Sequence, residues 1–206
     1  MVIIVKSFSN DILYTLIFAI PCVLLATSYL LNNPNFITGK NKNGKRSITL
    51  SVLNSPWLII TYICWYISSE LSKEDKCNKI INNIFISRYP VVVPNDEFDL
   101  IIDLTSEFPK PKIGNNNYLC VPNLDGVALK NINIPEIDPK SKVLIHCAQG
   151  HGRSSSYCAL VLIKLGIANS TFEALNIIKK SRPGAVPSKS QLKQLLKLEN
   201  KYKSLD

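Results

Sequence analysis

Charged side chains are missing from two long stretches of the 206-residue chain, residues 12–31 and 48–67. Each stretch has the ~20 apolar residues that a helix needs to cross a bilayer core. The first is strongly apolar, and its one proline, Pro21, is tolerated in a membrane helix. The second is weaker, because Asn54, Ser55 and Pro56 interrupt its first half. The sequence predicts two transmembrane helices arranged as a hairpin.

Each apolar stretch has an alternative interpretation. The first could be a signal peptide, but it is long for one, and residues 32–34 (Asn-Asn-Pro) follow it in place of a small-residue cleavage site. The second could be a buried or interfacial helix, since Trp57, Trp65 and Tyr66 suit a membrane interface.

The six cysteines contain no CxxC pair and no repeated spacing. This pattern argues against a structural zinc site and against a disulfide framework, and no metal or organic cofactor is implied. Cys120 and Cys158 lie within apolar runs, as inert core thiols do. Cys147 lies in different surroundings, between an apolar run and two glycines.

The lysines are scattered and are not gathered with aromatic residues, which argues against nucleic-acid binding. The net charge is +9. That charge is consistent with attraction to anionic lipid or to a phosphorylated substrate, although solvated surface lysines account for it equally well.

A polar segment after residue 67 divides the chain near Asp75. We expect residues 1–74 to form a membrane anchor and linker. Residues 75–206 then form one compact domain of roughly 130 residues, an ordinary domain size. No internal repeat is visible.

Short β-rich runs and helical patterns alternate in the predicted domain. The runs expected to be strands are residues 84–87, 100–104, 118–121 and 143–146, and the expected helices are 154–165, 170–180 and 188–201. The run 143–146 is too apolar for a strand with one solvated face. The predicted fold class is therefore α/β, with a mostly parallel central sheet flanked by helices.

The run 143–146 leads directly into Cys147, after which two glycines precede Arg153 and a helix. A thiol at a helix N-terminus beside an arginine is favoured in its ionised, nucleophilic form. Gly150 and Gly152 let the backbone curl so that its amides point inward at a phosphate. Arg153 can grip two phosphate oxygens with its planar fork, and Ser154 can donate a hydrogen bond to Cys147. The residues predict a nucleophilic site for phosphate esters.

The run His146-Cys147-x-x-Gly150-x-x-Arg153-Ser154 resembles the signature of the protein tyrosine phosphatase superfamily, in particular its dual-specificity branch of bacterial type. The resemblance implies a cysteine-dependent phosphatase fold and a cysteinyl-phosphate intermediate. The phosphate-binding loop that it implies is made by His146, Ala148, Gln149, Gly150, His151 and Gly152 around the catalytic Cys147 and Arg153. We expect His146 to order this loop.

The resemblance extends over roughly residues 79–198. Residues 102–107 look like a strand and turn of bacterial dual-specificity-like proteins, and Arg182-Pro183 looks like the pair that ends a helix after the signature. Where eukaryotic relatives often have Pro-Asn after that pair, this chain has Pro187-Ser188.

The family also needs an aspartate that protonates the leaving oxygen. Asp125 follows a predicted strand and resembles the family's acid loop, so it is the expected general acid. Asp103 ends a strand and is expected to cap the following turn, and Asp138 precedes a proline too close to the loop to reach over it.

The expected substrates are protein phosphotyrosine, phosphoserine and phosphothreonine. The alternatives are a lipid phosphate (a phosphoinositide or phosphatidylglycerophosphate), a non-catalytic phosphate-binding module, and a sulfurtransferase, which has no need of the glycine-arginine-serine run. The residues do not fix an oligomeric state. Positive charges flank both sides of the second apolar stretch, and a reactive thiol survives best in a reducing compartment. We therefore expect a multi-pass membrane protein with its catalytic domain on the cytoplasmic side.

Overall fold

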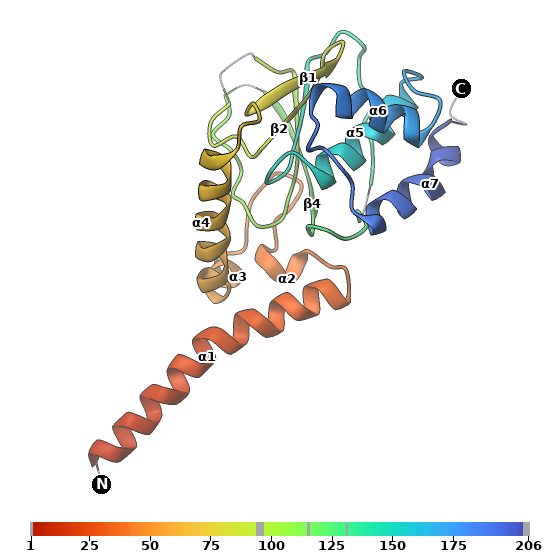
Figure 1. Cartoon of the computed structure of the whole chain (residues 1–206). Coiled ribbons are helices and arrows are strands. Elements are labelled where there is room, and N and C mark those ends of the chain that lie inside the picture. The colour runs from red at the N-terminus through yellow and green to blue at the C-terminus, as the bar shows by residue number, and fades with distance from the viewer. Residues whose placement is uncertain (1, 94–96, 115, 131, 204–206) are drawn as a thin grey trace.

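The computed structural model describes residues 2–93, 97–114, 116–130 and 132–203, with the side chains described from residue 15 onward. Within this range the chain folds around one five-stranded sheet, with helices on both sides (Figure 1). The predicted α/β class is confirmed.

The sheet has the strand order β1-β2-β5-β3-β4. Its strands are β1 (Cys77–Ile81), β2 (Ile84–Ser87), β3 (Leu100–Thr105), β4 (Asn117–Asn123) and β5 (Val143–His146). Strands β2, β5, β3 and β4 are parallel, and only β1 pairs antiparallel, with β2. The four predicted strands are confirmed. Strand β1 was not expected, because its polar residues at the sheet edge look like a linker.

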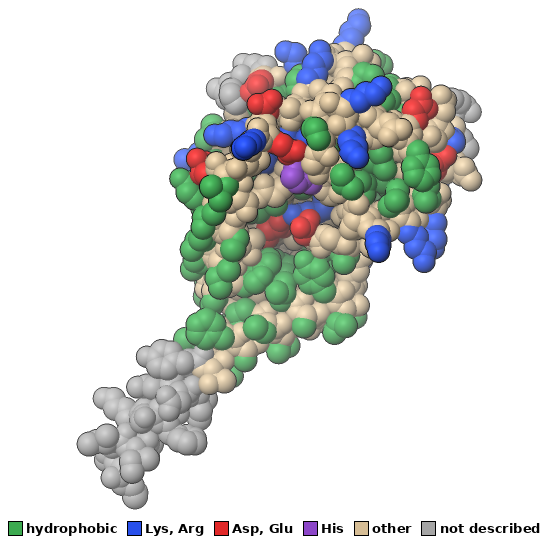
Figure 2. Space-filling view, in the orientation of Figure 1, with side chains coloured by type: hydrophobic (Ala, Val, Ile, Leu, Met, Phe, Trp, Pro, Cys, Tyr) green, Lys and Arg blue, Asp and Glu red, His purple; other side chains and the backbone are tan. Residues whose placement is uncertain are grey.

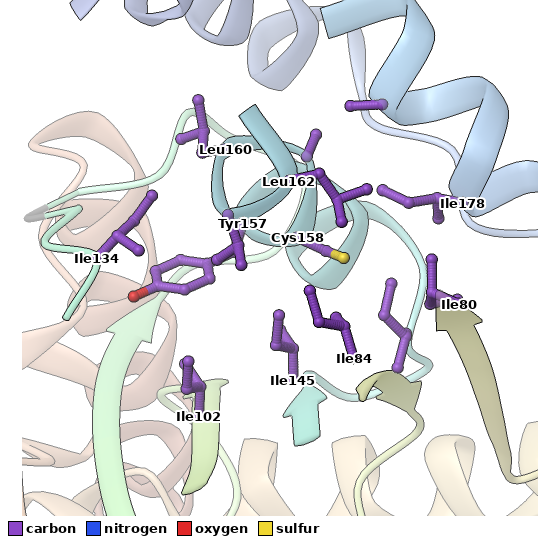
Figure 3. Close-up of a cluster of buried hydrophobic side chains, with 14 of the residues drawn as sticks. Ile80, Ile84, Ile102, Ile134, Ile145, Tyr157, Cys158, Leu160, Leu162 and Ile178 are labelled. Carbon is purple, nitrogen blue, oxygen red and sulfur yellow. The ribbon is translucent and has the colours of Figure 1, made fainter. Parts of the chain in front are cut away.

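Three helices follow the last strand: α5 (Gly152–Lys164), α6 (Thr171–Ser181) and α7 (Lys189–Lys203). The central one, α5, is buried along nearly its whole length because β-strands lie on one side and α6 and α7 on the other. Tyr157 and Cys158 of α5 face isoleucines of the sheet, whereas Leu162 faces Ile178 of α6 (Figure 3). This core fixes where β5 ends and α5 begins, and hence the loop between them.

Four helices precede the sheet: α1 (Val2–Leu30), α2 (Asn35–Thr38), α3 (Ile48–Leu53) and α4 (Ser55–Leu71). The predicted continuous helix over 48–67 is wrong, because it is split at Asn54. Pro56 lies in the first turn of α4 and lacks the N–H that would continue the bonding of α3. Among the described residues, no helix combines the length and the apolar character needed to cross a membrane. The two predicted spans are thus not found there; residues 12–14 of the first lie outside the described side chains.

Buried contacts join the N-terminal segment to the sheet domain across the expected division at Asp75. The Lys40 ammonium lies 2.7 Å from a carboxylate oxygen of Asp103, with both side chains fully buried. The Thr38 hydroxyl donates to the Ser106 carbonyl at 2.6 Å, and the Trp65 indole donates to the Ala148 carbonyl at 2.9 Å. Buried side chains of α2, of the loop after it and of α4 therefore contact the part of the sheet domain that carries the Cys147 loop.

Candidate active site

The loop between β5 and α5 carries Cys147 at its start, and the thiol is 2% exposed. Gly150 has a φ of +71°, which favours glycine. A Cβ at Gly150 would also lie 2.6 Å from the carbonyl oxygen of Ser87. The adjacent strand end of β2 thus forces this loop into a tight curl that only glycine permits.

The carbonyl oxygens of the loop point outward and are held by groups around it. Ala148 accepts from the Trp65 indole and from the Tyr89 backbone N–H, both at 2.9 Å. The Arg182 guanidinium donates to the Gln149 and Gly150 carbonyls, also at 2.9 Å. Among the described residues, the backbone N–H groups of residues 148–151 have no hydrogen-bond partner. The loop therefore offers a ring of donors to an anion, beside the N-terminus of α5.

Arg153 is fully buried and is clamped from one side by Glu107. The two guanidinium terminal nitrogens donate to the two Glu107 carboxylate oxygens at 3.0 and 2.7 Å, and one of them also donates to the Asn123 carbonyl at 2.9 Å. Burial alone would lower the pKa of Arg153, but the Glu107, Asp125 and Cys147 charges raise it well above its ordinary value. The Nε–H has no hydrogen-bond partner among the described residues. The arginine is a permanent cation, and its Nε–H makes no hydrogen bond with the described residues.

Asp125 lies in the loop after β4 and is brought to the site. Its carboxylate oxygen is 3.1 Å from Arg153 Nε, and its side chain is 69% exposed. It thus combines reach to the arginine with access to a substrate, as a proton donor to a leaving group requires. Asp138 instead caps a local turn by accepting from the Lys140 N–H.

Asp103 is not part of the anion site. Its carboxylate accepts from Lys40 and from the Tyr118 hydroxyl, each at 2.7 Å, and from the Thr105 N–H at 2.8 Å. The last bond is the predicted cap of the turn. Burial alone would raise the pKa of Asp103, but the charges of Lys40 and His146 and the hydrogen bonds lower it to about 2. Asp103 is an ionised structural group.

His146 and Ser154 flank the loop inside the protein. Both are fully buried, and neither the His146 ring nitrogens nor the Ser154 hydroxyl has a hydrogen-bond partner among the described residues. Burial lowers the pKa of His146 below its ordinary value, against the raising effect of Asp103, which lies 3.8 Å away. A neutral His146 fits an ordering role. The expected Ser154–Cys147 hydrogen bond is not present, so the role of Ser154 stays a prediction.

His151 pairs with Glu74 at the outer edge of the loop, with Nε2 2.6 Å from the carboxylate. The other Glu74 oxygen accepts from the Gly184 N–H at 2.8 Å. Burial would raise the pKa of Glu74, but these contacts and Arg182 lower it. His151 of the expected phosphate-binding loop therefore has a partner, Glu74, in the segment expected to be a linker.

A cavity of about 290 Å³ opens beside the loop. Ala148, Gln149, Arg153, Glu107 and Asp125 line it from the sheet domain. Tyr29, Trp57, Thr61, Cys64, Trp65 and Ser68 line it from α1 and α4. In Figure 2 side chains of both charges lie in a hollow directly above a surface of hydrophobic side chains. The N-terminal helices thus form one wall of the candidate active site.

Sequence reasoning missed three groups that shape the site: Glu107, Arg182 and Trp65. Glu107 lies three positions after Leu104, the last apolar residue of a strand, and this position was the available signal for a buried partner of a buried arginine. Arg182 was noted only as a helix end, and Trp65 only as an interfacial residue. Their contacts are distant in sequence, and no local pattern reports them.

A parallel sheet whose central strand delivers a cysteine into a loop of inward-facing amides, closed by an arginine, defines the class of cysteine-dependent phosphatases. The family model "Dual specificity phosphatase, catalytic domain" matches residues 84–201, more than half of the chain. The chain therefore belongs to the dual-specificity phosphatase family and is a cysteine-based phosphatase by class. No curated protein sequence matches it.

Solved structures of phosphatases share this fold at low sequence identity. A variant of human DUSP28 aligns with a TM-score of 0.50 and 18% identity, covering 65% of this chain and 100% of its own. Tk-PTP in a mutant form aligns with a TM-score of 0.47 and 24% identity, covering 62% and 97%. PTPMT1 in complex with PI(5)P aligns with a TM-score of 0.46 and 17% identity, covering 62% and 97%. At such identities the likeness concerns the fold alone.

Proposed function

We propose that the chain hydrolyses phosphate monoesters through a phosphocysteine at Cys147. In the first step the sulfur attacks phosphorus, the ester P–O bond breaks, and Asp125 gives its proton to the leaving oxygen. In the second, water attacks phosphorus, Asp125 takes its proton, and the S–P bond breaks to restore the thiolate. Phosphate is then released and no metal is required.

One observation carries this proposal: the buried Nε–H of Arg153, which faces Asp125 at 3.1 Å without a hydrogen bond, lies beside backbone amides of residues 148–151 that make no hydrogen bond within the described residues. Unpaired buried donors are costly, and they are retained where a ligand satisfies them. The Glu107 clamp fixes the guanidinium plane so that this donor is pre-oriented. The arrangement therefore supports binding of a tetrahedral dianion next to Cys147.

The experiment is the hydrolysis of an aryl phosphate by the full chain and by Cys147→Ser. The hydroxyl lacks a thiol's ionisation near neutral pH, so we expect a loss of about 10³-fold or more. Binding of inorganic phosphate to Cys147→Ser, measured by titration calorimetry, should persist because Arg153 and the loop are intact. Undiminished turnover in Cys147→Ser would refute the nucleophile. Phosphate binding by a wild type without turnover would favour the alternative, a non-catalytic phosphate-binding module.

The substrate classes that we propose are phosphorylated proteins and, as a second candidate, phospholipids bearing a phosphate monoester. A specific observation favours the lipid: apolar side chains on the exposed faces of α1 and α4 border the cavity. We also propose that residues 1–74 attach the chain to a membrane, with the catalytic domain on the cytoplasmic side. A reducing compartment keeps the Cys147 thiol from oxidation.

A further inference from the structure

The exposed surface of α1 and α4 is apolar over a long extent. In α1 the side chains of residues 15–20 are all exposed, among them Leu16, Ile17, Phe18 and Ile20. In α4 the exposed set includes Ile60, Ile67 and Leu71, at 57%, 51% and 78% exposure. Isolated apolar side chains on a surface are ordinary, but a continuous face of this kind marks a binding surface.

The occupant of this face can be inferred from α1. Six consecutive exposed residues cover every side of a helix, since a turn takes 3.6 residues. A protein partner covers one side of a helix, whereas hydrocarbon surrounds it. In Figure 1 this part of α1 lies below the ends of α3 and α4 and runs away from the sheet domain. A helix with exposed, mostly apolar side chains all around it fits insertion into a lipid leaflet.

Charge near this face also bears on the occupant: a cationic groove lies on the neighbouring side of α4, and the exposed Glu70 lies after the second apolar stretch. Neither apolar stretch contains an acidic residue. Arg46 lines a groove of about 280 Å³ together with Leu58, Ile59 and Ile63 of α4. A cation beside aliphatic side chains matches an anionic headgroup beside its acyl chains.

The apolar stripe of α4 borders the stripe that lines the phosphate cavity. Ile60 and Ile67 are each three to four positions from Cys64, so all three lie along one side of the helix. Cys64 itself lines the cavity with Arg153 and Asp125. A ligand held against the stripe therefore has its polar end at the mouth of the cavity. The hollow with charged side chains lies directly above the hydrophobic surface (Figure 2).

We infer that α1 and α4 dock the chain on a bilayer surface and that the substrate is a membrane phospholipid with a terminal phosphate monoester. This inference rests on the proposed hydrolysis at Cys147 and selects the phospholipid from the two proposed substrate classes. Docking places the cavity at headgroup level, so the phosphate enters from the membrane side along α4. The lipid is converted to its dephosphorylated form in the bilayer, and inorganic phosphate leaves to water.

The test uses the full chain with three substrates: an aryl phosphate, a phosphotyrosine peptide, and phosphatidylcholine vesicles containing phosphatidic acid or a phosphatidylinositol monophosphate. We expect the chain to sediment with the vesicles. We also expect hydrolysis of at least one vesicle lipid to exceed that of its short-chain, water-soluble form by about tenfold in kcat/KM, because docking supplies binding energy.

Variants separate docking from chemistry. Ile60→Gln/Ile67→Gln should lose about tenfold on vesicles and keep wild-type activity on the aryl phosphate, since neither side chain lines the cavity. Phe172→Gln, which changes an equally exposed (59%) apolar residue on α6, is the matched control and should change neither activity. If the α4 variant also loses aryl phosphatase activity, Phe18→Gln/Val23→Gln on α1 repeats the comparison.

The outcomes distinguish the two proposals. A wild type that is inactive on the aryl phosphate refutes the proposed hydrolysis at Cys147. An active wild type that does not sediment with vesicles, or that cleaves the vesicle lipids no faster than their soluble forms, refutes the lipid inference alone. Preference for the phosphopeptide, unchanged by vesicles or by the α4 variant, assigns the face to a protein partner and also overturns it.

Discussion

At the scale of single residues, Arg153 lies between two carboxylates that differ in burial and in hydrogen bonding. Glu107 is buried and bonds both terminal nitrogens, whereas Asp125 is exposed and approaches Nε without hydrogen-bond geometry. Under the proposed mechanism, a phosphate oxygen that accepts the Nε–H would displace Asp125 toward the leaving group, while the Glu107–Arg153 pair would remain in place.

If Asp125 protonates the leaving oxygen, Asp125→Asn should slow alkyl phosphates by about 100-fold or more, because an alkoxide is a poor leaving group. Aryl phosphates with acidic phenols should be affected far less. The measurement is kcat/KM over a series of leaving-group pKa values. Asp138→Asn is the control and should match the wild type, since Asp138 caps a remote turn. A steeper dependence of kcat/KM on leaving-group pKa in Asp138→Asn than in Asp125→Asn would assign the general-acid role to Asp138.

The Lys40–Asp103 pair predicts a pH dependence of stability. The pKa of Asp103 is lowered to about 2 in the folded chain, below its ordinary value of 3.8. Its ionised form therefore stabilises the fold fully above about pH 4, and this contribution, about 2 kcal/mol, is lost as the pH falls through 2. Urea unfolding between pH 2 and 6 should show a smaller loss for Lys40→Met/Asp103→Asn than for the wild type. Equal losses would contradict the assignment.

The residues of the phosphate loop were predictable because their spacing is local. Cys147, Gly150 and Arg153 follow one another within a strand, a turn and a helix, and each has a chemical reason to be there. The lysine that pairs with Asp103 was not predictable, since Lys40 lies 63 positions earlier in a polar loop and nothing local indicates that it is buried.

At the scale of elements, α4 supports the loop through a single indole. Trp65 packs among Tyr89 and Phe108 and donates to the Ala148 carbonyl. That bond helps to keep the carbonyl outward and the neighbouring amides inward. Trp65 is therefore a positioning residue of the site.

Trp65→Phe should keep the packing and lose the hydrogen bond. We expect a loss of kcat of roughly tenfold on the aryl phosphate and weaker binding of inorganic phosphate, at the net value of about 1 kcal/mol for one hydrogen bond. Trp57→Phe, which lines the cavity without such a bond, is the control. Thermal unfolding serves as the check of packing. If Trp65→Phe lowers the stability of the chain but leaves its phosphate affinity unchanged, Trp65 contributes packing alone and does not position the loop.

The elements of the sheet domain were predicted because each apolar run has clear ends. Strand β5 begins with three apolar residues and is buried on both faces, and the Ser170 hydroxyl accepts from the Glu173 N–H at the start of α6. The N-terminal elements were predicted less well. Hydropathy indicates that residues 48–67 are apolar, but it does not indicate whether lipid or protein contacts them. In the structure, Trp65 packs against Tyr89 and Phe108.

At the scale of the whole molecule, the N-terminal helices and the sheet domain share buried polar contacts. A fragment without the first 74 residues leaves Asp103 buried without Lys40 and removes the wall of the cavity. Loss of one partner of a buried pair costs about 3–5 kcal/mol. We expect this fragment to unfold at lower temperature and to lose most aryl phosphatase activity, whereas a chain lacking residues 1–14 should keep both. A fragment as stable and active as the full chain would contradict these contacts.

The central claim is that phosphate passes through Cys147. Its most direct test is acid quenching of the full chain within the first turnovers of an aryl phosphate, followed by mass spectrometry of the peptide that contains residues 143–164. We predict a phosphoryl group on Cys147 in the wild type, at higher occupancy in Asp125→Asn because water is then poorly activated, and none in Cys147→Ala. Turnover without a phosphopeptide, or a phosphoryl group that persists in Cys147→Ala, would contradict the account.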